Sequence, residues 1–163
     1  MAAYDIKGKY AIVTGAGSGS SFLNLEGGCS VTIADVKLWP EAEALVTKYA
    51  SKDATTPVDF HKADISDWGQ IASLWKKTLE TFGRIDIVVN GAGVYEPPSS
   101  TFWNAPGISP LAEDKVDASP GVYHTFSVNA IGPIHLAQIA IDYWLENRNP
   151  SDGGGRLGRL DEA

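Results

Sequence analysis

A glycine-rich turn follows the first apolar run of this 163-residue chain. Residues 15–19 read Gly-Ala-Gly-Ser-Gly, and glycines allow the backbone to approach a bound group closely. A helix that begins after such a turn directs its backbone N–H groups at an anion, as a pyrophosphate site requires. Asp35 ends the second apolar run, where a carboxylate can accept hydrogen bonds from ribose hydroxyls. This spacing predicts a dinucleotide site.

The elements that position these residues alternate between apolar runs and segments of helical period. Such alternation favours an α/β fold with a doubly wound parallel sheet over an all-α or all-β fold. Strands are expected near residues 9–14, 30–35, 57–62 and 85–89. Because open α/β sheets bind ligands at the carboxyl ends of their strands, the site is expected at that edge.

Helices are predicted between the strands and after the last one. Pro40 suits the first turn of the helix that it begins. Ser66 is expected to cap the next helix, which Gly83 ends. A third helix is predicted from about residue 120 to 146, bent or delayed by Pro133. It rests on side chains at helical spacing: Ile131, Ile134, His135, Gln138, Ile141 and Leu145.

Composition narrows the range of partners. Thirteen basic against 20 acidic residues give a formal charge of −7, which argues against nucleic acid and anionic membranes as partners. No apolar run approaches the ~18 residues of a membrane span, so a cytoplasmic protein is expected. Cys29 is the only cysteine and is expected to be a buried structural thiol. The three histidines, His61, His124 and His135, are expected to be structural or surface groups.

Residues 1–146 are expected to form one domain, and the polar, glycine-rich residues 147–163 a flexible C-terminal tail. Between the fourth strand and about residue 118 the chain carries several prolines and no clear helical period. A loop of that length in a compact domain is usually either functional or poorly ordered.

Five segments, in order, resemble the short-chain dehydrogenase/reductase family of Rossmann-fold proteins: Thr14-Gly15-x-x-x-Gly19, Asp35, Asp64-Ile65, Asn90-Gly91-Ala92-Gly93 and Asn129-x-x-Gly132. The resemblance implies an NAD(P)-binding Rossmann-like sheet truncated to about four strands with flanking helices. It implies NAD as cofactor, with NADP less favoured. The residues implied to hold the cofactor are Thr14, Gly15, Gly17, Ser18, Gly19, Asp35, Asp64, Ile65, Asn90, Gly91, Ala92 and Gly93.

Individual roles also follow from the resemblance. Asp35 would bind the adenosine ribose and repel a 2′-phosphate, although the nearby Lys37 weakens that preference. Asp64 and Ile65 would flank the adenine, with Asp64 receiving its exocyclic amine. A structural reading stays open for Asp64, which could instead assist the helix start at Ser66.

Asn129 matches the active-site asparagine of the family, which holds a water in the proton relay. It is the only catalytic position of the family that this chain retains. A plain polar position on a helix is the alternative for Asn129. The turn that begins at Asn90 would line the cofactor, or Asn90 would only tie backbone groups together.

The acid/base of the family is missing from the sequence. In this family a tyrosine transfers the proton, a lysine four residues later lowers the pKa of its phenol, and a serine orients the substrate oxygen. None of the six tyrosines here is followed by lysine at that spacing. Ser151 is the only serine after Asn129, and it precedes the strand where the family places its serine. The parental activity would be oxidoreduction of a secondary alcohol or ketone, with this truncated chain inactive.

Other readings stay open. Residues 20–28 leave a first helix about one turn shorter than in the family. The stretch 90–98 resembles fungal hydroxyprostaglandin-dehydrogenase-like members. The chain could be a non-catalytic NAD-sensing or partner-binding module, or an unstable product of a mis-spliced gene. An uncovered strand at 85–89 would favour self-association or a homo-oligomer.

Overall fold

The computed structural model describes residues 4–18, 26–49, 56–95, 103–112, 114–119 and 121–147. Its strands are β1 Tyr10–Thr14, β2 Ser30–Asp35, β3 Val58–Lys62 and β4 Ile87–Asn90. Its helices are α2 Pro40–Tyr49, α3 Trp68–Phe82, α4 His124–Phe126, the π-helical turn η1 Ser127–Ile131, and α5 Gly132–Glu146. The strands form one parallel sheet in the order β3-β2-β1-β4, which confirms the predicted α/β class and the four predicted strands.

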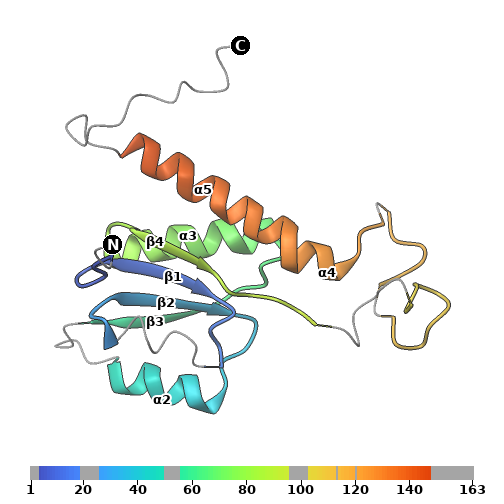
Figure 1. Ribbon diagram of the computed structural model, residues 1–163, viewed down its shortest axis with the longest axis horizontal. Helices are drawn as coiled ribbons and strands as arrows, with labels where there is room; N and C mark the ends of the chain where they lie inside the picture. Colours follow the sequence, from blue (N-terminus) through green and yellow to red (C-terminus); the bar gives the residue numbers. More distant parts are fainter. Residues whose placement is uncertain are drawn as a thin grey trace, which may run out of the picture.

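Helices cover both faces of this sheet, with α2 on one side and α3 and α5 on the other (Figure 1). Successive strand residues point to opposite faces. In β1, Val13 packs into the cluster on the α2 side, while its neighbour Ile12 packs into the cluster with α3 and α5. In β2, Ile33 likewise packs on the α2 side and its neighbour Ala34 on the side of α3 and α5. The central strands are therefore buried on both faces, as doubly wound sheets require.

The strand order reverses at β1. From β1 the chain proceeds to β2 and β3 on one side, then returns to place β4 on the other side. The register pairs Thr14 with Ala34 of β2 and with Asn90 of β4, so all three strands end at the same edge. Such a reversal opens a crevice at the carboxyl ends of the strands.

The ends of α2 and α3 test the predicted helix signals. Pro40 begins α2, and Gly83 ends α3 with φ 79°, both as predicted. The prediction that Ser66 caps α3 is wrong, because Asp67 is the N-cap and accepts a hydrogen bond from Gln70 N. Hydrogen bonds from the side chain and backbone of Gln70 lower the pKa of the Asp67 carboxyl.

The helix predicted over residues 120–146 is confirmed from His124 onward, and it contains the π-helical turn η1. Pro133 lies in the first turn of α5. Proline has no N–H to donate to the carbonyl of Asn129, so the usual α-helical hydrogen bond cannot form there. The helix continues past this point rather than ending.

The face of α5 that packs on the sheet is not the one with the predicted apolar spacing. Val128, Leu136 and Ala140 are buried in the cluster with α3. By contrast, Ile134 and Ile141 are 59% and 54% exposed. The helix therefore carries a second apolar stripe on its outer face.

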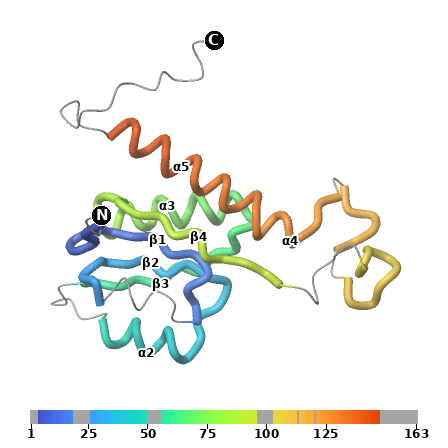
Figure 2. The backbone as a smooth tube through the Cα atoms, viewed as in Figure 1, coloured from blue at the N-terminus to red at the C-terminus, as the bar shows by residue number. Residues whose placement is uncertain are grey.

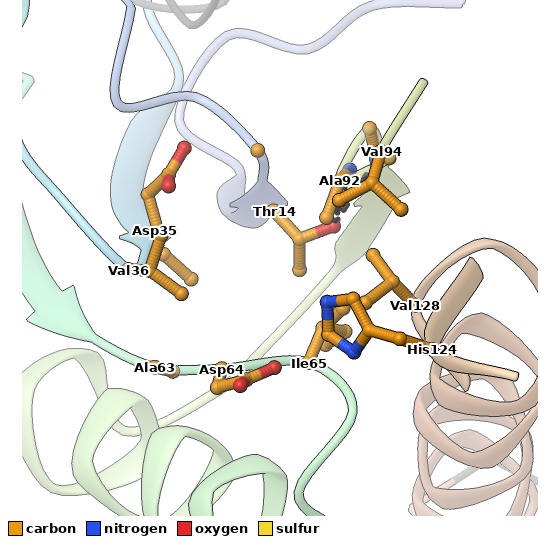
Figure 3. Close-up of a pocket in the computed structure, with 14 residues that line it drawn as sticks. Thr14, Asp35, Val36, Ala63, Asp64, Ile65, Ala92, Val94, His124 and Val128 are labelled. Atoms are coloured by element: carbon orange, nitrogen blue, oxygen red, sulfur yellow. Dashed lines mark hydrogen bonds between the residues drawn. The ribbon is translucent and has the colours of Figure 1, made fainter. Parts of the chain in front are cut away.

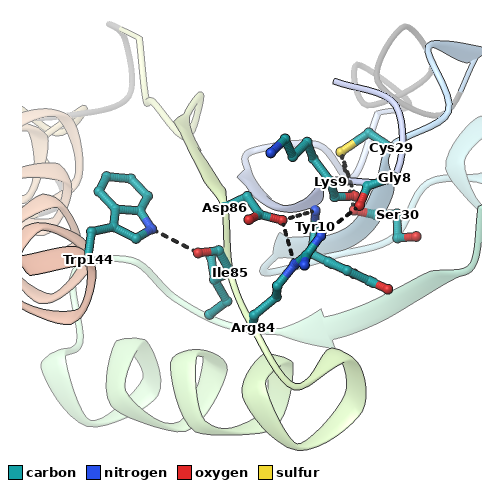
Figure 4. A network of polar contacts seen from close by, with 9 residues as sticks. All are labelled: Gly8, Lys9, Tyr10, Cys29, Ser30, Arg84, Ile85, Asp86 and Trp144. Atoms are coloured by element: carbon teal, nitrogen blue, oxygen red, sulfur yellow. Dashed lines mark hydrogen bonds and ion pairs between the residues drawn. The ribbon is translucent and has the colours of Figure 1, made fainter. Parts of the chain in front are cut away.

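Polar contacts join the amino ends of β1 and β4 (Figure 4). The Asp86 carboxylate accepts hydrogen bonds from Tyr10 N at 2.9 Å and from Arg84 Nε at 3.1 Å. The indole N–H of Trp144 donates to the carbonyl of Ile85 at 2.8 Å. This last bond fastens the carboxyl end of α5 to the segment that leads into β4.

Cys29 is fully buried just before β2, as predicted. Its Sγ lies 3.3 Å from the carbonyl oxygen of Lys9 and 3.5 Å from that of Ser30 (Figure 4). Burial, and to a lesser degree the charge of Asp86, raises the pKa of the thiol to about 11. The thiol is therefore protonated at neutral pH.

Several predictions fall on residues outside the described ranges, among them the shortened first helix and the tail after residue 147. Residues 103–112 and 114–119 lie beyond the amino end of α4, to one side of the sheet (Figure 1, Figure 2). None of the helices in the described ranges is both long and apolar enough to cross a membrane. In the described sheet β4 is an edge strand with Val89 36% exposed, and self-association through it stays a prediction.

Leu136→Ala tests the packing of α5. Leu136 is fully buried, so its truncation should lower the free energy of unfolding by about 2–5 kcal/mol. The matched control is Ile134→Ala on the exposed face, which should change it by less than ~1 kcal/mol. Urea unfolding measures both values, and equal losses would contradict the orientation of α5.

Candidate functional site

A cavity of about 230 Å³ lies at the carboxyl ends of the strands, where the strand order reverses (Figure 3). Eight of the twelve residues predicted to hold a cofactor line it: Thr14, Gly15, Asp35, Asp64, Ile65, Gly91, Ala92 and Gly93. The same edge of the sheet thus gathers residues from β1, β2, and the turns after β3 and β4. This is where open α/β sheets bind ligands.

The glycine turn is held against β2. Gly15 has a φ of 69° and its N–H donates to the carbonyl of Ala34 at 2.8 Å. A Cβ at Gly15 would lie 2.5 Å from the Cα of Ala92, so any side chain would push the β1 and β4 turns apart. Gly17 does not line the cavity, but its N–H donates to Asp35 Oδ2 at 2.8 Å. The carboxylate and the turn are therefore in direct contact.

Ser18 is exposed and outside the cavity lining, and Gly19 lies outside the described residues. Beyond the turn, Trp39 N donates to the carbonyl of Gly17 at 2.8 Å. The ammonium of Lys37 lies 4.1 Å from the centroid of the Trp39 ring. This cation–π contact engages the lysine whose charge bears on cofactor choice.

The hydroxyl of Thr14 joins the ends of β1 and β4. Its Oγ1 accepts hydrogen bonds from Gly91 N at 3.1 Å and Ala92 N at 3.2 Å. It also lies 3.4 Å from the carbonyl of Val89, to which it donates. Thr14 is only 2% exposed, so these backbone partners replace water for its hydroxyl.

After β3 the chain places Asp64 and Ile65 on the cavity floor (Figure 3). Asp64 Oδ1 accepts from Ser66 N at 2.9 Å and from Ser66 Oγ at 2.7 Å. The structural reading of Asp64 therefore accounts for one carboxylate oxygen, and Asp64 also lines the cavity.

Both predicted asparagines tie backbone segments together. Asn129 Nδ2 donates to the carbonyl of Val94 at 2.9 Å, and its Oδ1 accepts from Val94 N at 2.8 Å. Asn90 Nδ2 donates to the carbonyl of Pro133 at 3.3 Å. Neither side chain lines the cavity. They fix the turn after β4 against the η1–α5 helix.

Six residues of the cavity lining were not predicted: Ala34, Val36, Ala63, Val94, His124 and Val128. Four of them adjoin predicted residues in the sequence, and Val128 directly precedes Asn129. His124 is different, because the sequence favoured a structural or surface role for it. Its ring points into the cavity from the amino end of α4 (Figure 3), and its backbone N–H donates to Asp114 Oδ1 at 2.8 Å. The signal that was available is spacing, since residues 124 and 128 share one helical face.

The cavity combines an acidic rim with apolar walls. Asp35 and Asp64 supply carboxylates, while Val36, Ile65 and Val128 supply flat apolar contacts. Carboxylates accept hydrogen bonds from hydroxyl and amino groups. Within the described ranges, no group of three or more His, Cys, Asp or Glu could hold a metal ion. The arrangement suits an organic ligand with a planar ring and hydroxyls.

The curated proteins similar to this chain include a reductase and a dehydrogenase. The chain is 27% identical over 156 residues to 3-oxoacyl-(acyl-carrier-protein) reductase of Thermotoga maritima, covering 90% of this chain and 54% of that protein. It is 27% identical over 155 residues to 15-hydroxyprostaglandin dehydrogenase (NAD(+)) of Rattus norvegicus, covering 91% of this chain and 48% of that protein. The chain therefore spans about half the length of the curated relatives it matches.

A solved structure agrees with these relatives. The 3-ketoacyl-(acyl-carrier-protein) reductase of Brucella melitensis, complexed with NADH, superposes with a TM-score of 0.63 and 25% identity. The superposition covers 87% of this chain and 52% of that one. A family model described as short chain dehydrogenase matches residues 9–155. Because that match includes most of the sequence, this chain belongs to the short-chain dehydrogenase/reductase family.

Proposed function

We propose that the chain binds a nicotinamide dinucleotide, NAD in preference to NADP, at the carboxyl ends of β1 and β4. The observation that carries this proposal is the cavity into which the fold brings the glycine turn, Asp35, Asp64 and the turn after β4. These segments are far apart in sequence and meet only at the reversal of strand order. A related reductase of known structure is complexed with NADH.

Each wall of the cavity suits one part of the dinucleotide. The turn at Gly15 suits the pyrophosphate, which needs close backbone approach. Asp35, held by the N–H of Gly17, suits the adenosine ribose. Asp64 and Ile65 suit the adenine, with an acceptor at its edge and an apolar contact on its face.

The preference for NAD follows from charge. Asp35 lines the cavity with a carboxylate, which repels a 2′-phosphate on the ribose. Lys37 is the nearby cation that would offset this repulsion. Its ammonium lies over the Trp39 ring instead. The net effect favours NAD, whose adenosine ribose has a free 2′-hydroxyl, over NADP.

The 163-residue chain is proposed to bind without turnover. The parental reaction would transfer a hydride between the nicotinamide and a small secondary alcohol or ketone, and it needs an acid/base for the proton. None of its tyrosines has a lysine four residues later. Asn129, the one retained position, has both amide atoms bonded to the backbone of Val94. Its side chain serves the architecture of the site.

Asp35→Asn tests the cofactor preference. Removing the charge while keeping the size should weaken NADH binding and relieve repulsion of NADPH, shifting the ratio of their dissociation constants about tenfold toward NADPH. Isothermal titration with both cofactors measures the ratio. Asp142→Asn makes the same charge change on the exposed side of α5 and should leave the ratio unchanged. Equal shifts in both variants would contradict the role of Asp35.

A turnover assay tests the absence of chemistry. The purified chain with NAD and a panel of secondary alcohols should form no NADH above the rate without protein, because a positioned acid/base supplies about 10²–10⁴ of the rate. NADH absorbance measures this. Turnover that co-purifies with the chain and is lost in Asp35→Asn would show that other residues supply the proton.

A further inference from the structure

Polar side chains are unevenly distributed around the cavity. Four lining residues have polar side chains: Thr14, Asp35, Asp64 and His124. Asp35 ends β2, Asp64 follows β3, and His124 faces the cavity from α4, near Val128 (Figure 3). Thr14 is the last residue of β1, the strand beside β4. Both carboxylates that can meet a ligand therefore lie on the side of β2 and β3.

The polar side chains toward β4 are already used within the protein. Thr14 Oγ1 bonds to the backbone of Val89, Gly91 and Ala92. Both amide atoms of Asn129 pair with the backbone of Val94. Among the described residues, the β4 side thus meets a ligand mainly with glycine and alanine backbone and with the Val94 side chain.

These two sides correspond to the two halves of a dinucleotide. The acid at the end of the second strand takes the adenosine ribose, and the glycine turn takes the pyrophosphate. The nicotinamide riboside then extends past the turn toward β4. The nicotinamide carboxamide needs hydrogen-bonding partners, and the lining residues after β4, which are Gly91, Ala92, Gly93 and Val94, have no polar side chain.

The size of the cavity supports the same division. Its volume of about 230 Å³ falls below the ~300–1,000 Å³ of sites that enclose larger ligands. A nucleoside is less than half of a dinucleotide. A cavity of that size therefore matches one nucleoside of a dinucleotide.

We infer that the ligand class of this chain is the adenosine diphosphate group, so that ADP-ribose binds as tightly as NAD. The inference rests on the proposed function, since it assigns binding to one half of the same site. His124 and Val128 line the same cavity as Asp64, to which the proposed function assigns the adenine. The nicotinamide adds little to affinity.

Isothermal titration of the 163-residue chain with ADP-ribose, NAD and nicotinamide mononucleotide tests the inference. We expect dissociation constants for ADP-ribose and NAD within about fivefold of each other, and no saturable binding of the mononucleotide. NAD binding more than about fivefold tighter than ADP-ribose, or saturable binding of the mononucleotide, would overturn the inference and leave the proposed function standing. Absence of binding by both ADP-ribose and NAD would overturn the proposed function and this inference with it.

A pair of histidine variants locates the site. His124→Leu should weaken ADP-ribose and NAD by the same factor, about threefold or more, because both ligands share the adenine. His61→Leu changes a β3 histidine outside the cavity lining and should leave both affinities unchanged. A cooperative unfolding transition in each variant confirms that it folds. Unchanged affinity in folded His124→Leu, or a loss for NAD alone, would contradict the placement of the adenine.

Discussion

The hydroxyl of Thr14 is the interaction on which the site depends. It bonds to three backbone groups of the β4 turn and so holds the ends of β1 and β4 together where the strand order reverses. Thr14 is only 2% exposed, and each hydrogen bond of its hydroxyl contributes about 0.5–1.5 kcal/mol to this geometry. Valine in place of Thr14 would keep the strand but lose these hydrogen bonds between β1 and the turn after β4. The crevice therefore depends on these bonds as well as on the sheet.

The helical wall of the site follows from the same turn. Both side-chain amide atoms of Asn129 form hydrogen bonds with the backbone of Val94, which brings η1 against the turn after β4. Gly132 then passes so close to the carbonyl of Ile65 that a Cβ there would collide with it. Residues 128 and 132 share a helical face. Close approach at Gly132 therefore also brings Val128 to the cavity.

The sequence predicted the elements well because their signals are local. Alternating apolar runs located the four strands, and the φ of Gly83 agrees with its predicted place after α3. The cap of α3 was assigned to Ser66 because serine and aspartate are both good caps, and only the backbone geometry at Asp67 decides between them. Local patterns thus locate the beginnings of the strands to within two residues, whereas the last helix begins at His124 and not near residue 120.

Contacts between distant segments were harder to predict from the sequence. The apolar stripe with Ile134 and Ile141 has helical spacing, yet α5 packs through Leu136 and Ala140. Both stripes are apolar, so periodicity alone cannot select the buried one. The spacing of His124 from Val128 indicates only that they share a helical face. The place of His124 in the cavity depends on where the helix crosses the end of the sheet.

The Asp35 carboxylate shows why the site is formed before any ligand arrives. Oδ2 accepts from Gly17 N at 2.8 Å, and each carboxylate oxygen has two acceptor positions. The same group can therefore fix the turn and still accept ribose hydroxyls. A turn that is already ordered loses less conformational entropy on binding. Binding geometry thus depends on β1, β2 and their turns, whereas proton transfer depends on groups that these segments do not contain, so the two properties are physically separable in one fold.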